Sequence, residues 1–109
     1  MPKAILLEAN GKARIIQVNG YKELQKAVDG NIEGLRLGDS NQFSYINEDG
    51  ISLGLPQNDV ATKLCTYFNV GLWSDDFIKG SMVIVGPVDD NGEDTDVSNE
   101  MMEYLNLKE

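Results

Sequence analysis

Short apolar runs separated by turn residues dominate the chain and predict more strands than helices. Alternating or continuous apolar residues predict strands at about 3–8, 13–18, 32–38, 43–47 and 81–88. Asn10-Gly11 lies between the first two runs, and such a pair is the strongest short-range indication of a hairpin. The last run is the most continuous, so we expect it to be the central strand of a sheet.

Apolar residues at helical spacing predict three helices. The first spans 21–28 and ends at Asp29-Gly30, where glycine suits a left-handed C-terminal position. The second spans about 59–68, with Asn58 as its N-cap and a broad apolar face that we expect to pack on the sheet. The third is short and follows Ser98, another capping residue.

A second hairpin is predicted at Asp49-Gly50, with Ile51-Ser52-Leu53 as its returning strand. If the strand at 43–47 lay outermost, its free edge would allow a homodimer by strand pairing. The mixed order of strands and helices predicts an α+β fold. We expect a mostly antiparallel sheet with two packed helices and an acidic C-terminal helical extension.

Charge is distributed unevenly along the chain, whose net charge is −9. Residues 1–88 carry 10 acids and 8 bases, whereas residues 89–109 carry 8 acids and one base. We therefore expect an α+β core domain at 1–88, and an acidic turn and helix at 89–109 that form part of the same domain or a flexible tail. Direct nucleic-acid binding is disfavoured, because phosphate contacts require clustered Lys and Arg.

The chain contains no histidine and a single cysteine, Cys65. These counts exclude Ser-His-Asp and Cys-His catalysis, the usual zinc sites and an intramolecular disulfide. We expect no cofactor, although carboxylate-bound magnesium remains compatible with the composition. Cys65 lies on the apolar helix face, which favours a buried structural cysteine over a reactive thiol. No segment has the apolar length of a secretory signal or membrane span, so a cytoplasmic protein is expected.

Three segments carry a resemblance to a known family. They are a helix that ends in Gly-x-Ile-Glu, an acidic turn followed by Leu-Pro-x-Asn-x-x-Ala, and a strand with Gly-x-x-x-Ile-Val-Gly, at residues 21–33, 47–62 and 78–86. In this order and spacing they resemble the small proteins of phages and mobile elements known as domain of unknown function 3846. The resemblance implies a phage, prophage or plasmid source in a bacterial host, and it supplies no mechanism.

The acidic run at 89–96 allows three interpretations. An EF-hand is excluded, because counting back from Gly92 places Pro87 at the first ligand position, but a looser magnesium site remains open. A solvated turn around Gly92 is the simplest interpretation. The third is an interaction surface that attracts a basic partner, such as a DNA-binding host or defence protein. Its contact residues would be Asp89, Asp90, Glu93, Asp94 and Asp96.

Two further residues are candidates for contact with a partner or ligand. Trp73 lies in a predicted loop, where it would either bind a partner or fill the core. Asn58 ends the segment Leu55-Pro56-Gln57-Asn58, and free N–H groups at a helix start can bind an anion. A capping role is the simpler interpretation of Asn58.

These observations support three functional hypotheses. The first is a non-enzymatic phage or mobile-element accessory protein that binds and modulates a host or defence protein through its acidic surface. The second is a module that binds or sequesters a small nucleotide-like molecule. The third is a magnesium-dependent phosphohydrolase, which we rank last because no basic residue lies near the acids to hold a phosphate. It would use Asp89, Asp90, Asp94 and Asp96.

Overall fold

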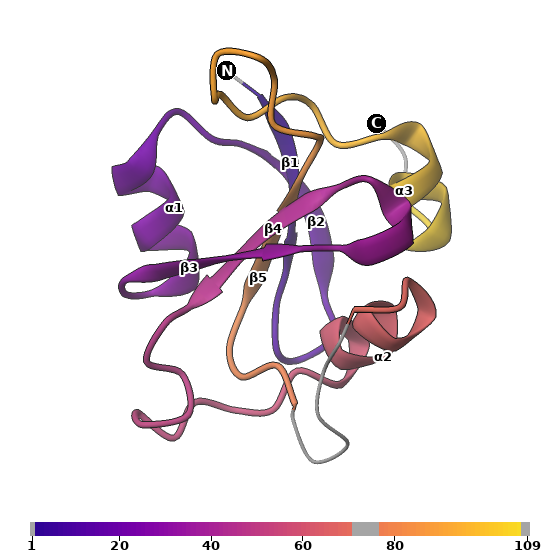
Figure 1. The fold of residues 1–109 in the computed structure, drawn as a ribbon. Helices are drawn as coiled ribbons and strands as arrows, with labels where there is room; N and C mark the ends of the chain where they lie inside the picture. The colour runs from indigo at the N-terminus through magenta and orange to yellow at the C-terminus, as the bar shows by residue number, and fades with distance from the viewer. Residues whose placement is uncertain (1, 71–76, 108–109) are drawn as a thin grey trace.

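The computed structural model describes residues 2–70 and 77–107 and shows a five-stranded antiparallel sheet with helices on both faces (Figure 1). The strand order is β2-β1-β5-β4-β3. The strands are β1 (Lys3–Leu7), β2 (Ala13–Gln17), β3 (Ile32–Arg36), β4 (Phe43–Asn47) and β5 (Met82–Val85). The helices are α1 (Tyr21–Val28), α2 (Asp59–Tyr67) and α3 (Asn99–Tyr104), with a 3-10 turn η1 at Gly38–Ser40. The predicted α+β fold is confirmed.

Strand β5 lies at the centre of the sheet, as predicted. It pairs with β1 on one side and with β4 on the other, so that Ile84 lies opposite both Ile5 and Ser44. All of its residues are buried. A strand covered on both faces has no solvent side, which explains its continuous apolar run.

Strands β1 and β5 each contribute to two cores, because alternate side chains of a strand point to opposite faces of the sheet. Helices α2 and α3 cover one face, and α1 covers the other (Figure 1). The first core includes Ile5, Leu7, Leu64, Met82, Ile84 and Met101. The second includes Leu6, Leu24, Val28, Val83 and Val85.

The segment after residue 96 packs into the first core. The hydroxyl of Ser98 accepts a hydrogen bond from the backbone N–H of Met101 (3.1 Å), which confirms the predicted helix start. Val97, Met101 and Met102 are buried against the same core as β1 and β5. The short helix is therefore held by apolar burial, which its 6 residues need because so short a helix is marginal by itself.

Helix α1 ends as predicted, but a different residue adopts the left-handed conformation. Asp29, and not Gly30, has the positive φ of 64°. Gly30 is required for space instead, since a Cβ atom there would lie 2.6 Å from Nδ2 of Asn47.

The second hairpin predicted at Asp49-Gly50 is wrong. Residues 51–53 form turns, and the side chains of Ile51 and Leu53 are 74% and 61% exposed. Strand β4 instead forms its hairpin with β3, from Ile32 opposite Asn47 to Arg36 opposite Phe43. Its other side is occupied by β5, so no position beside β4 remains for a strand at 51–53.

The strand at 43–47 is interior, so the condition for dimerisation through its edge is not met. The sheet edges are β2 and β3. Exposed side chains on these edges include Arg14 of β2 and Glu33 and Arg36 of β3. Charges on an edge strand oppose the addition of a further strand. Within residues 2–70 and 77–107, no helix combines the length and apolar character needed to cross a bilayer.

Candidate functional site

Residues 89–96, which we call the acidic loop, form an ordered turn after β5. Oδ1 of Asp89 accepts hydrogen bonds from the backbone N–H groups of Asn91 (2.9 Å) and Glu93 (3.0 Å). The backbone N–H of Asp89 donates to the carbonyl oxygen of Glu93 (2.9 Å), and that of Gly92 donates to the carbonyl oxygen of Asp89 (2.9 Å). The Asp89 carboxylate therefore stabilises the turn from within.

Two other carboxylates attach the acidic loop to the sheet. Asp94 accepts a hydrogen bond from the hydroxyl of Tyr45 on β4 (2.7 Å). Burial, followed by this hydrogen bond and the negative charge of Asp94, raises the pKa of Tyr45 well above its usual value, so the hydroxyl stays protonated and donates. Asp96 accepts from the backbone N–H of Lys3 on β1 (2.7 Å). The loop is thus fixed at both β1 and β4.

The structure divides the predicted contact residues into two groups. Asp89, Asp94 and Asp96 each use an oxygen to hold the loop, whereas the carboxylates of Asp90 and Glu93 hold no group of the described chain. All of these side chains except that of Asp94 are exposed. Trp73 lies outside the described residues. In the described part of the chain, no three acidic or cysteine side chains are placed to hold a metal ion. The four aspartates of the magnesium hypothesis are therefore not brought together there.

Asn58 is fully buried and connects the start of α2 to two strands. Its Oδ1 accepts from the backbone N–H of Ala61 (3.0 Å), which confirms the N-cap prediction. Its Nδ2 donates to the carbonyl oxygens of Leu7 (3.0 Å) and Gly80 (2.9 Å). The Asn58 side chain therefore satisfies three backbone groups of the protein itself.

Cys65 is buried on α2, as predicted, and burial raises its pKa to about 11. An unfolded cysteine titrates near pH 8.5, so the thiol's contribution to stability is complete below that pH and is lost as the pH rises toward 11. We expect Cys65 to resist a thiol-specific reagent at about pH 8 in the native protein and to react rapidly in urea. Equal reaction rates in the two states would contradict this prediction, and absorbance of the released chromophore measures both.

A groove lies on the α1 face of the sheet, between α1 and strands β1 and β2. Helix α1 packs mainly against β3, β4 and β5, and Leu6 of β1 packs at the margin of the same core. Residues directly opposite one another in an antiparallel pair point to the same face. Arg14 is opposite Leu6, which packs in the α1 core, so Arg14 lies on this face.

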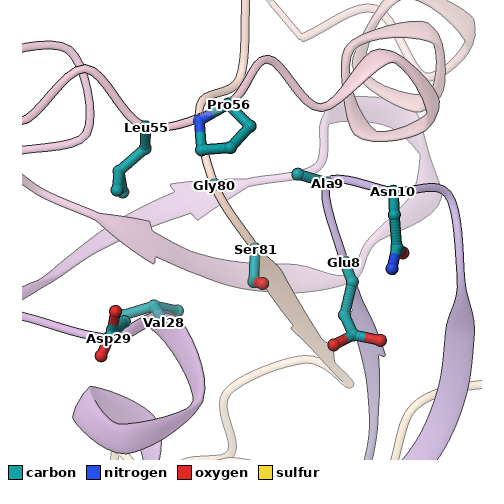
Figure 2. Close-up of a pocket in the computed structure, with 9 residues that line it drawn as sticks. All are labelled: Glu8, Ala9, Asn10, Val28, Asp29, Leu55, Pro56, Gly80 and Ser81. Carbon is teal, nitrogen blue, oxygen red and sulfur yellow. The ribbon is translucent and has the colours of Figure 1, made fainter.

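Two adjoining pockets of about 440 and 420 Å³ form this groove, which we call the β1–α1 groove. Both are lined by Glu8 and Ser81, which therefore lie where the pockets meet. Figure 2 shows the first pocket, with Leu55 and Pro56 on one side and the end of α1, including Asp29, across from them. Ser81, just before β5, lies between these walls, and Glu8, just after β1, lies on the side of Ser81 away from Asp29 (Figure 2).

The sequence did not reveal the β1–α1 groove. Side chains alternate between the two faces of the sheet, so continuing this alternation past β1 places Glu8 on the same face as Leu6. This was the local indication of the groove in the sequence. It was insufficient, because the groove is formed by residues of β1, β2, α1 and the Leu55-Pro56 segment that only the fold brings together.

Comparison with known proteins extends the resemblance seen in the three sequence segments. No curated protein and no solved structure matches this chain. The family described as "Domain of unknown function (DUF3846)" matches residues 2–108, which include every strand and helix described above. The chain therefore belongs to the DUF3846 family.

Proposed function

We propose that this chain is a non-enzymatic accessory protein of a phage or mobile element that binds and modulates a host or defence protein through its acidic loop. The supporting observation is that the loop is held in one conformation by Asp89, Asp94 and Asp96, while Asp90 and Glu93 remain exposed. A preformed surface loses less conformational entropy on binding than a flexible tail would.

The charge of this region selects for a basic partner. Residues 89–107 contain 7 acids and no Lys or Arg. A surface of one sign attracts the opposite sign and accelerates association at low ionic strength. The DNA-binding surface of a host or defence protein has the required positive charge, and the acidic loop would occupy it in place of a phosphate backbone.

Neutralising the two exposed acids of the loop should weaken this binding without unfolding the protein. The variant D90N/E93Q removes two charges that hold no backbone group through their side chains in the described structure. Exposed charge pairs contribute about 0.2–1 kcal/mol each, so we expect a loss of roughly 2- to 30-fold in affinity. The partner is first captured from bacterial host lysate with the tagged protein, and its Kd is then measured at low and high salt.

A matched control removes the same charge elsewhere on the surface. The variant E48Q/D49N neutralises two exposed acids of the turn after β4 and should bind like the parent. A partner that both variants bind with the parent's affinity, or a Kd that does not change with salt, would contradict the proposal.

A further inference from the structure

The basic residues of the β1–α1 groove are confined to one of its two pockets. The first pocket is lined by Glu8 and Asp29 and by no basic residue of the described chain. The second pocket is lined by Arg14 and Lys26 together with Glu8 and Glu23. Oε2 of Glu23 accepts a hydrogen bond from the backbone N–H of Asn19 (2.7 Å), so this carboxylate is engaged at the start of α1. Asp29 therefore makes one end of the groove acidic, Glu8 lies where the two pockets meet, and the other end holds both bases beside the engaged Glu23.

The charged groups of the groove are not paired with each other. Glu8 lies two residues beyond Leu6, the residue opposite Arg14, and such diagonal neighbours have Cα atoms about 7–8 Å apart. Long side chains can pair across that separation, yet no ion pair or hydrogen bond engages the Glu8 carboxylate within the described residues. The half-buried Glu8 carboxylate is therefore free to contact a cationic ligand.

The floor of the second pocket is apolar. It is formed by Leu6 and Ile16 of the sheet and Ala27 of α1. The half-buried Ser81 lies where the two pockets meet and offers a hydroxyl beside Glu8. An apolar surface with a few polar groups at defined places is the usual composition of a small-molecule site.

We propose that the β1–α1 groove binds a small dipolar molecule, whose ammonium group contacts Glu8 and Asp29 and whose carboxylate contacts Arg14 and Lys26. Its aliphatic or peptide middle covers the apolar floor. Amino acids with a terminal amine and short peptides with free ends share this chemistry. A nucleotide fits less well, because its phosphates would bring negative charge toward Glu8. No residue of the acidic loop lines the groove, so this inference does not depend on the proposed partner binding.

The test compares a dipolar probe with analogues that each lack one charge. Amide chemical shifts are followed by nuclear magnetic resonance while the protein is titrated with 6-aminohexanoate, hexylamine or hexanoate. We expect 6-aminohexanoate to shift the amides of Glu8, Arg14 and Ser81 and to bind about tenfold more tightly than either analogue, since a hydrogen bond to a charged group contributes appreciably to affinity. Trialanine and its N-acetylated, C-amidated form then separate a peptide ligand from a free amino acid.

Substitutions at the two ends should have opposite selectivities. E8Q should weaken binding of 6-aminohexanoate to the level of hexanoate and leave hexanoate unaffected. R14Q should weaken it to the level of hexylamine and leave hexylamine unaffected. The controls E33Q and K22Q change exposed residues that do not line the groove and should bind like the parent. Unchanged melting temperatures would show that all four variants remain folded.

Three results would overturn the inference. One is equal affinity for the dipolar probe and its analogues. Another is the absence of saturable shifts at the groove with either 6-aminohexanoate or trialanine. The third is a result in which adenosine monophosphate shifts the groove amides but 6-aminohexanoate and trialanine do not. That result would assign the groove to a nucleotide-like ligand instead.

Discussion

Replacing Asn58 with alanine should lower the free energy of unfolding by about 3–5 kcal/mol, a large share of the 5–15 kcal/mol typical of a domain. The substitution removes the N-cap of α2 and three hydrogen bonds to buried backbone groups. These groups are the N–H of Ala61 and the carbonyl oxygens of Leu7, which is also paired with Met82 of β5, and Gly80. A lost cap costs about 1 kcal/mol, an unsatisfied buried carbonyl about 1–3 kcal/mol, and one lost hydrogen bond at a group that keeps another partner about 0.5–1.5 kcal/mol. Urea unfolding followed by circular dichroism measures the change.

Two further variants separate the capping role of Asn58 from its contacts with the strands. Serine accepts the capping hydrogen bond but cannot reach both carbonyl oxygens, so Asn58→Ser should recover only about 1 kcal/mol of the loss. Asn19→Ala changes an exposed asparagine and should have almost no effect. A loss below about 1 kcal/mol for Asn58→Ala would show that the three backbone groups find other partners.

Replacing Gly38 with alanine should lower the free energy of unfolding by about 2–5 kcal/mol. Gly38 has a φ of 48°, in the left-handed region that L-residues seldom adopt. An added Cβ atom would also overlap with the carbonyl oxygen of Phe68, at the end of α2. That atom belongs to the backbone, so relieving the overlap requires movement of η1 or of the helix end. Thermal and urea unfolding both measure the effect.

Gly54 provides the matched control for Gly38. It has a similar φ of 66°, but a Cβ atom there would meet nothing within 4 Å. Gly54→Ala should therefore cost only the conformational penalty, about 1–2 kcal/mol. If both variants lost equal stability, the close approach of Gly38 to Phe68 would contribute nothing to the loss and would not explain the effect of Gly38→Ala.

The sequence by itself determined the elements whose cause is local. The hairpin at Asn10-Gly11 forms because Gly11 takes a φ of 90° and Asn10 accepts a hydrogen bond from the backbone of Lys12. Asn58 and Ser98 cap their helices through the residue three positions later. Interactions across so few residues depend little on the rest of the chain, so pattern and turn chemistry predict them well.

The neighbours of each strand were decided only by the tertiary structure. Ile51-Ser52-Leu53 has strand-forming residues after a turn pair, yet β4 is already bordered by β3 and β5. Local strand propensity does not show that β5, and not residues 51–53, pairs with β4, because β5 begins 35 residues after β4 ends.

The candidate sites show the same division. The sequence identified the acidic residues of 89–96, but two of the three carboxylates that hold the loop do so through partners far away in the chain. Asp94 meets Tyr45 across 49 positions, and Asp96 meets Lys3 across 93. The β1–α1 groove depended entirely on how the fold brings β1, β2, α1 and the Leu55-Pro56 segment together. The sequence shows which residues can carry charge or accept hydrogen bonds. Which of them lie next to one another is decided by the packing of the folded chain.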